Sequence, residues 1–415
     1  MTVNDVLHVS MFGTPVGQLR RRHPDGPFVF VDDPLWIRHG MTPLFSLQYQ
    51  TTHKLKKSSL SNLPRWFEHL LPPQHGFLRR LLQVKTGVNN VAGHWLLSLV
   101  GSDLPGAVVV SGTVEPSHEI PIPSPDPTFR FSLAGMQLKF SVDAVGERFA
   151  IPGRGAFGRW IVKIPGDSFL DLPEVELTTM EWARRSGLRV PECRVVPVDH
   201  IDGLGTTIVQ QSPTVYAVRR FDRTDSGGRI HQEDFAQVLD IDADEESIYG
   251  RIGTNYLSYD SALMMVHDVV GDAAAVELAR RIAFVIVSGN GDAHLKNWGF
   301  YWPDPNTHIP HLSPCYDQVA TIVWERFGWD QPDGPELALR LSKSKRFVDI
   351  DTARIRHLLR RVNVPGLEDA FYETLFAAKN TWPMLEPRPP KPMVAAIEQH
   401  FANVPLLRHV GSPPD

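Results

Sequence analysis

The spacing of hydrophobic and polar residues gives the first part of the chain a mixed character. Residues 1–112 alternate short β-type runs with turns, and the runs at 28–31 and 107–110 are the clearest predicted strands. Between them, leucines recur at helical spacing over residues 63–84, which predicts a helix. This region is therefore expected to form a small α/β subdomain. The proline-rich segment 116–127 that follows it is predicted to be a linker, because proline disfavours helices and lacks a backbone donor.

The residues after the linker are predicted to form an antiparallel sheet, with one helix between its strands along the chain. Apolar runs separated by short polar turns are typical of such a sheet. The helical stretch covers about 173–187, where Gly187 suits a C-terminal cap. The predicted strands are 129–133, 138–142, 149–151, 160–164, 194–198, 206–210 and 216–221.

From residue 232 onward the pattern becomes mostly helical, most clearly at 273–288 and 354–359. A β-rich half that holds one helix, followed by an α-rich half, is the layout of a bilobal kinase. We therefore predict an α+β, protein-kinase-like fold with an additional N-terminal α/β subdomain. The predicted parts are an N-terminal subdomain at 1–115, a β-rich N-lobe at 116–220 and an α-helical C-lobe at 221–415.

Composition narrows the class of protein. The 415 residues are 42% hydrophobic and 21% charged, as in ordinary globular proteins, and no run approaches the ~18 apolar residues of a membrane helix. The start of the chain lacks a secretory signal pattern, and Cys193 and Cys315 give no disulfide framework. A cytoplasmic location without membrane contact is therefore expected. The formal charge of −5 provides no general attraction to nucleic acid.

The strongest chemical signal is the segment 290–297, together with an acid that follows it. Asp292 and Asn297 stand five positions apart, as the catalytic Asp and metal-binding Asn of protein kinases do. Asp317, after an apolar stretch, suits a second metal-binding acid. Phosphoryl transfer needs this combination, because one carboxylate orients the attacking hydroxyl and the other oxygens hold Mg²⁺. The alternative is a polar loop, because these residue types are also common in turns.

A lysine upstream could complete such a site. Lys163 lies in a predicted strand with apolar neighbours, where a buried ammonium requires an anion. It suits either the lysine that contacts nucleotide phosphates or an edge-strand lysine that faces water. Glu174 or Glu176 on the following helix could hold it as an ion pair.

Two segments compete as the phosphate-covering loop. Residues 153–158 match G-x-G-x-x-G but end only five residues before Lys163. A loop that joins the first two strands should lie a full hairpin further upstream, as residues 132–137 do. We therefore interpret 132–137 as the phosphate loop and 153–158 as a hairpin connection.

Taken in order, these segments resemble the HipA-type toxin kinases, which are serine/threonine kinases of bacterial toxin–antitoxin modules. The resemblance covers nearly the whole chain, including 63–72, which is similar to the family's N-terminal subdomain. The other matching segments are 132–139, 161–165, 217–223, 231–234, 291–297 and 314–317.

The resemblance implies a protein kinase that uses ATP and Mg²⁺. Asp292 would orient the substrate hydroxyl, and Asn297 and Asp317 would hold Mg²⁺. His294 and Lys296 would belong to the catalytic loop, with His294 ordering it through hydrogen bonds to backbone carbonyls. Residues implied in ATP binding are Ser132, Ala134, Gly135, Gln137, Lys139, Lys163, Glu176, Arg219 and Phe221.

The resemblance also implies regulation and partners. Ser132 matches the serine that the family autophosphorylates, which expels the loop and stops the enzyme. The default target is a protein such as an aminoacyl-tRNA synthetase. The usual partner is a helix-turn-helix repressor, or antitoxin, so that contact with DNA is indirect. Two departures stand out: Arg219 replaces an acid of the best-known member, and residues 242–259 match no familiar segment.

Two other functions stay open at this point. A small-molecule phosphotransferase of the aminoglycoside or choline kinase type also carries D-x-H-x-x-N, as residues 292–297 do. Such enzymes tend to place two acids together at the second metal motif, whereas Gln318 and Val319 follow Asp317 here. The third reading is a catalytically silent co-repressor scaffold, which would normally lack at least one of the site residues.

Overall fold

The computed structural model of the 415-residue chain describes residues 6–21, 23, 26–72, 79, 92–112, 138–146, 148–152, 157–166, 169, 171–202, 213–252 and 255–408. The linker at 116–127 and the phosphate loop at 132–137 lie outside these residues, as does the predicted boundary at 115/116. The chain forms two compact units. Unit 1 comprises residues 1–173, 194–244 and 300–308, and unit 2 comprises 174–193, 245–299 and 309–415.

Unit 1 begins with a four-stranded sheet in the order β3-β2-β1-β4. Its strands are β1 (Val6–Met11), β2 (Thr14–Arg20), β3 (Val29–Asp32) and β4 (Val108–Ser111), so the predicted strands at 28–31 and 107–110 are confirmed. Burial alternates along β1, as expected for a sheet with one face against a core. That core is aromatic and includes Trp36, Phe45, Trp66 and Phe67.

Short helices cover this sheet. They are α1 (Pro34–Arg38), α2 (Leu47–Thr52), α3 (Arg65–Glu68), α5 (Gly93–Val100) and the 3₁₀ helix η1 (Gly101–Asp103). The helix predicted at 63–84 is only partly formed, because α3 ends at Glu68 and residues 69–71 form a turn, while most of the later residues lie outside the described part of the chain.

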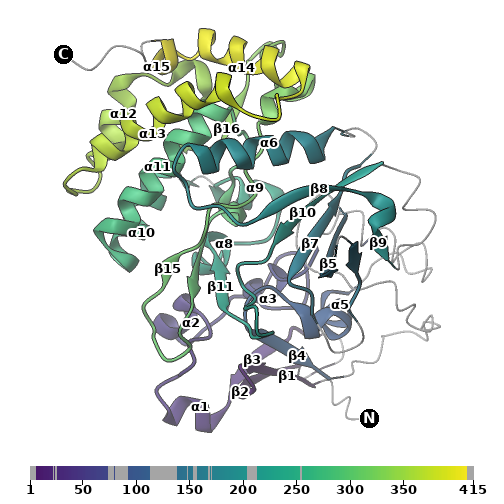
Figure 1. The fold of residues 1–415 in the computed structure, drawn as a ribbon. Coiled ribbons are helices and arrows are strands. Elements are labelled where there is room, and N and C mark those ends of the chain that lie inside the picture. Colours follow the sequence, from purple (N-terminus) through teal and green to yellow (C-terminus); the bar gives the residue numbers. More distant parts are fainter. Residues whose placement is uncertain are drawn as a thin grey trace. The chain divides into compact units, whose positions relative to one another are not determined.

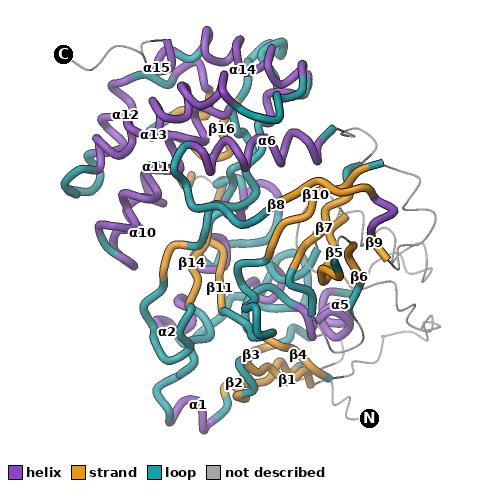
Figure 2. Tube along the Cα trace, viewed as in Figure 1, coloured by secondary structure: helices purple, strands orange, loops and turns teal. Residues whose placement is uncertain are grey.

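The second sheet of unit 1 has six strands in the order β8-β10-β7-β5-β6-β9 (Figures 1 and 2). Its centre is antiparallel, and apolar side chains such as Val142, Val162 and Val215 form a core on it. The strands are β5 (Leu138–Val145), β6 (Arg148–Ala150), β7 (Trp160–Ile164), β8 (Cys193–Pro197), β9 (Ile201–Asp202) and β10 (Thr214–Arg219), with the 3₁₀ helix η2 (Val198–His200) before β9.

This sheet confirms most of the predicted strands and corrects one connection. The predicted strands at 129–133 and 206–210 lie outside the described residues. Residues 151–159 join β6 to β7, and these two strands flank β5 rather than each other. β6 and β7 are therefore not hairpin partners, contrary to the prediction, and the glycine-rich residues 153–156 between them lie outside the described residues.

A buried carboxylate fastens β11 (His231–Asp234) to the N-terminal part of unit 1. The Glu233 side chain accepts hydrogen bonds from Trp66 Nε1 (2.6 Å) and from the Leu47 backbone N–H (2.9 Å). Burial outweighs these bonds and raises the pKa of the Glu233 carboxyl to about 7. Next to β11 lie α8 (Phe235–Val238) and β14 (Gly299–Trp302).

Glu233 is expected to make stability depend on pH. Its pKa is raised on folding, so the folded state retains a proton that the unfolded state releases, and the free energy of unfolding falls as the pH rises from about 4.5 to 7. Glu233→Gln cannot titrate and should lack this fall, which amounts to roughly 3 kcal/mol for such a shift. Urea denaturation of both proteins at about pH 5 and about pH 8 measures it. Parallel pH dependence in the two proteins would contradict the assignment.

Unit 2 is mainly helical, and α11 packs against both α10 and α13 (Figure 1). The central helix α11 is buried along most of its length, which explains its nearly continuous apolar sequence. Its helices are α6 (Leu172–Arg185, in this unit from Glu174), α9 (Glu245–Ile248), α10 (Tyr259–Val270), α11 (Asp272–Ser288), α12 (Thr352–Leu359), α13 (Leu367–Thr381), α14 (Lys391–Asn403) and α15 (Pro405–Arg408).

Short strands and 3₁₀ helices connect the helices of unit 2. The strands are β12 (Arg251–Ile252), β13 (Asn255–Tyr256), β15 (His311–Leu312), β16 (Glu336–Leu341) and β17 (Ser344–Arg346). The 3₁₀ helices are η3 (Leu295–Asn297), η4 (Thr321–Val323), η5 (Glu325–Phe327), η6 (Phe347–Asp349) and η7 (Trp382–Met384). No helix among the described residues is long and apolar enough to cross a membrane.

The helix predicted at 173–187 packs with the C-terminal helices. Trp182 of α6 donates from Nε1 to the carbonyl of Ala378 (2.7 Å) and packs its ring against Phe284. Gly187, with φ of 91°, follows the end of the helix as predicted. The division into parts at 1–115, 116–220 and 221–415 stays a prediction.

Candidate functional site

The loop with the kinase-like spacing begins where α11 ends. Gly289 adopts a left-handed conformation (φ 64°), and a Cβ there would lie 2.5 Å from the Ile322 side chain. Only glycine suits this combination of backbone angle and close approach. The helix therefore stops at a fixed position, and the following residues form a loop at its C-terminal end.

Two side chains hold the first part of this loop. Asn290 is fully buried, and its Oδ1 accepts a hydrogen bond from the Asp292 backbone N–H (2.9 Å). Its Nδ2 donates to Gln318 Oε1 (3.1 Å), which joins the loop to the segment that contains Asp317. The Gly291 N–H donates to Thr321 Oγ1 (2.8 Å). Asp292 therefore extends from a backbone whose polar groups are already satisfied.

The Asp292 carboxylate contacts two aromatic side chains. Its Oδ1 accepts a hydrogen bond from the Tyr249 hydroxyl, and His294 Nε2 lies 4.0 Å from the same oxygen. The His294 ring packs edge-on against the Tyr249 ring at 5.0 Å. Within the described part of the chain, the His294 imidazole donates no hydrogen bond to a backbone carbonyl, although the backbone N–H of His294 donates to the Asp292 carbonyl (2.7 Å), and Nδ1 of the ring is buried without a partner. His294 thus orders this region through ring packing, unlike the predicted carbonyl bonding.

Asn297 is tied to the backbone of Asp292. Its Nδ2 donates to the Asp292 carbonyl (2.6 Å), which leaves Oδ1 as the oxygen that an amide uses to bind a metal ion. Asp317 is half-buried and adopts a left-handed backbone (φ 52°), which is uncommon for a non-glycine residue. Lys296 is half-buried, and its carbonyl accepts a hydrogen bond from the Tyr316 hydroxyl (3.0 Å).

An amide oxygen and a carboxylate form an oxygen donor set of the kind that Mg²⁺ uses together with substrate phosphates. No group of three or more His, Cys, Asp or Glu side chains that could hold a metal ion occurs among the described residues. Asn297 and Asp317 are the residues that could supply such donors.

Two lysines stand side by side in the sheet of unit 1. Lys139 on β5 is paired directly with Lys163 on β7, and Tyr216 on β10 is the partner of Lys163 on the other side. Directly opposite residues project to the same face of a sheet, where like charges destabilise each other. Lys163 is only 6% exposed, with its Nζ 5.3 Å from the centre of the Tyr216 ring. The two lysines therefore place positive charge on that face of the sheet.

At the end of β10 and just after it, residues 219–222 alternate between half-buried and buried side chains. The Arg219 guanidinium pairs with Asp225. The Phe221 ring is half-buried and packs edge-on against Tyr301 (6.2 Å). The intervening Arg220 and the following Asp222 are buried instead.

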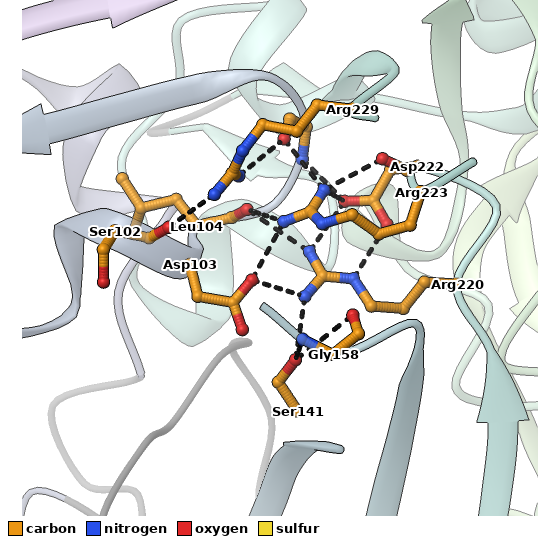
Figure 3. Close-up of polar contacts among 10 residues, drawn as sticks. Ser102, Asp103, Leu104, Ser141, Gly158, Arg220, Asp222, Arg223 and Arg229 are labelled. Atoms are coloured by element: carbon orange, nitrogen blue, oxygen red, sulfur yellow. Dashed lines mark hydrogen bonds and ion pairs between the residues drawn. The ribbon is translucent and has the colours of Figure 1, made fainter. Parts of the chain in front are cut away.

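Arg220 and Asp222 belong to a buried charge cluster (Figure 3). We use this term for Asp103, Arg220, Asp222 and Arg223. Asp222 accepts from Arg220 Nε (2.9 Å), Arg223 Nη1 (2.8 Å) and the Gly106 N–H (2.8 Å). Asp103 Oδ1 accepts from both arginines, at 2.8 Å and 3.0 Å. Despite its burial, the arginines hold the pKa of the Asp222 carboxyl far below its usual range, so Asp222 is a carboxylate at neutral pH.

Some of the residues predicted to bind ATP are not among those described above. Ser132, Ala134, Gly135 and Gln137 are outside the described residues. Glu176 on α6 is 3% exposed. The predicted pairing of Glu176 with Lys163 joins residues of different units and stays a prediction.

The sequence analysis did not identify Tyr249 or the buried charge cluster. Tyr249 lies 43 residues before Asp292, in the unmatched segment 242–259, and Asp103 lies 117 residues before Arg220. For the buried charge cluster, the only local signal in the sequence was the group of charged residues at 219–223, which follows the apolar residues of a strand.

Comparison with known proteins identifies the family to which the chain belongs. The family model described as HipA-like C-terminal domain matches residues 131–382, and the HipA N-terminal domain matches residues 7–111. The inferred kinase Y4dM of Sinorhizobium fredii is 34% identical over 427 aligned residues, which cover 97% of this chain and 98% of that protein. The serine/threonine-protein kinase toxin HipA of Shewanella oneidensis is 27% identical over 296 residues, covering 62% of this chain and 63% of that protein.

A solved structure supports the fold. A chain of the Shewanella oneidensis complex of HipA, HipB and operator DNA superposes with a TM-score of 0.66 at 18% identity, covering 99% of this chain and 100% of that chain. The fold is therefore the predicted α+β, kinase-like class. The chain belongs to the HipA family of kinases.

Proposed function

We propose that the protein transfers the γ-phosphoryl group of ATP to a serine or threonine hydroxyl of a protein. The observation that carries the proposal is the loop after α11. There, Asp292 presents a carboxylate while its own carbonyl fixes the amide of Asn297. One group can thus orient a hydroxyl, and the other can bind a metal ion through its oxygen.

The remaining residues have separate tasks in this proposal. Lys163 and Lys139 bind the nucleotide phosphates, because two adjacent ammonium groups favour a polyanion. Asn297 and Asp317 hold Mg²⁺, which neutralises the charge that develops on the phosphates. Arg219 and Phe221 contribute backbone contacts to adenine. His294 and Lys296 belong to the catalytic loop, and Glu176 is the helix acid.

A protein acceptor is favoured over a small molecule by the residue that follows Asp317. Gln318 accepts a hydrogen bond from the buried Asn290 and so braces the catalytic loop, where small-molecule kinases tend to carry another acid. The reading as a silent co-repressor scaffold is disfavoured, because the residues for phosphoryl transfer that fall in the described part of the chain are all retained.

We further propose that the kinase acts as the toxin of a toxin–antitoxin module in the cytoplasm. Its default target is an aminoacyl-tRNA synthetase, and its partner is a helix-turn-helix antitoxin that links it to operator DNA. Autophosphorylation of Ser132 would stop the enzyme, because a phosphate adds about −1.5 to −2 charges to the loop that covers the nucleotide phosphates. The family membership supports this proposal.

Induced expression in bacteria tests the toxin proposal. Wild-type protein is expected to stop growth and protein synthesis, whereas Asp317→Asn should permit growth because it removes a metal-binding charge. Asparagine tolerates the left-handed backbone at this position, so the variant should still fold. Equal growth arrest by both proteins at equal abundance would contradict the proposal.

A further inference from the structure

Tyr249 reaches the candidate catalytic carboxylate from a segment that the sequence analysis could not assign. It follows α9, and its hydroxyl donates a hydrogen bond to Asp292 Oδ1. Burial and the nearby Asp292 charge raise the pKa of this phenol far above its usual value, so Tyr249 stays a protonated donor. The edge-on contact with His294 restricts the rotation of its ring.

The backbone of Tyr249 is also held in place. Lys345 Nζ donates to its carbonyl oxygen (3.0 Å), and its N–H donates to the Glu245 carbonyl (3.1 Å). The next residue, Gly250, has φ of 87°, and a Cβ there would lie 2.8 Å from the Leu257 carbonyl oxygen. The turn that places the Tyr249 phenol next to Asp292 is therefore held by hydrogen bonds and by close backbone packing.

The two oxygens of the Asp292 carboxylate differ in their surroundings. Oδ1 accepts the Tyr249 hydrogen bond, whereas Oδ2 accepts none among the described residues. The Asp292 side chain is 40% exposed, so an incoming hydroxyl can reach it. A donor that fixes one oxygen also fixes the direction of the other.

We infer that Tyr249 is a positioning residue for Asp292, holding one carboxylate oxygen so that the other accepts the hydrogen bond of the protein acceptor hydroxyl. This inference rests on the proposed kinase function. Catalytic groups gain most when neighbouring hydrogen bonds fix their orientation before the substrate binds.

The surroundings of Tyr249 offer space for an acceptor segment. Tyr249 lines an open cavity of about 310 Å³, which is at the small end of ligand sites. Because the Tyr249 side chain both lines the cavity and contacts Asp292, the cavity lies close to Asp292. The wall of the cavity carries charges of both signs, which suits a polar peptide segment. The lining residues are Glu245, Glu246, Tyr249, Arg251, Tyr256 and Lys345.

Steady-state kinetics of Tyr249→Phe tests the inference. The variant retains the ring and removes only the hydroxyl, so kcat for protein phosphorylation is expected to fall about tenfold to a hundredfold, as for loss of one hydrogen bond to a charged group. The KM for ATP should stay unchanged. Tyr372→Phe in α13 is the matched control and should retain wild-type kcat. In an Asp292→Asn background, adding Tyr249→Phe should cause no further fall, because the carboxylate that it orients is already gone.

The outcomes separate this inference from the proposed function. If wild type and Tyr372→Phe transfer phosphate and Tyr249→Phe matches them, the positioning role is wrong and the kinase function stands. A faster Tyr249→Phe would also overturn the inference, because Tyr249 would then obstruct the acceptor. A further fall in the Asp292→Asn background would indicate a purely structural role. Absence of transfer by every protein, wild type included, would reject both proposals.

Discussion

Replacing Asp292 with alanine is expected to lower the rate of phosphoryl transfer to protein by about 10²- to 10⁴-fold, the usual contribution of a positioned acid–base group. The carboxylate orients the acceptor hydroxyl and does not bind the nucleotide in this account. The KM for ATP and the affinity for ATP should therefore change little. Radiolabelled phosphate transfer and calorimetric titration with ATP measure the two quantities separately.

Asp268→Ala is the matched control for this prediction. Asp268 lies on α10 in the same unit, and its side chain is 73% exposed. Its removal should leave the rate of transfer at the wild-type value. If both alanine variants showed the same rate, Asp292 would not be the residue that orients the hydroxyl.

Asp222→Asn is expected to cause the largest loss of stability. The substitution preserves the volume of the side chain but leaves Arg220 and Arg223, each no more than 1% exposed at the side chain, with only Asp103 as a counter-charge. Removing one partner from a buried ion network typically costs about 3–5 kcal/mol. Urea denaturation of the wild type and the variant at neutral pH measures this change in the free energy of unfolding.

The same substitution at an exposed ion pair provides the control. Asp202 pairs with Arg148 at 2.6 Å on the surface, where solvent screens the interaction, so Asp202→Asn should leave the stability almost unchanged. Similar effects at the two positions would mean that the buried charge cluster (Figure 3) does not stabilise unit 1 as argued.

Local sequence signals predicted the parts of the fold and site that depend on neighbouring residues. Apolar runs identified β5, β7 and β10, because a strand buried on a core must present such residues. The loop at 290–297 could be proposed as a site from the sequence because its motif lies within eight residues, and in the structure Asn297 hydrogen-bonds the Asp292 carbonyl.

Other features depend on tertiary contacts that no local pattern encodes. Tyr249 meets Asp292 only because the turn after α9 folds beside the end of α11. The buried charge cluster joins Asp103 to residues at 220–223, and sequence reasoning would place most of these charges on the surface. The strand order β7-β5-β6 likewise separates β6 from β7, whereas closeness in sequence favoured a hairpin between them.

Mass spectrometry after incubation with Mg²⁺ and ATP tests the central claim most directly. Purified wild type and Asp292→Ala are each incubated alone and with an undialysed bacterial lysate, which retains its metabolites, and phosphopeptides and phosphorylated metabolites are both measured. The account predicts new phosphoserine or phosphothreonine on proteins, including Ser132 of this chain, with the wild type only. A phosphorylated metabolite without any new phosphoprotein, or equal phosphorylation by Asp292→Ala, would contradict it.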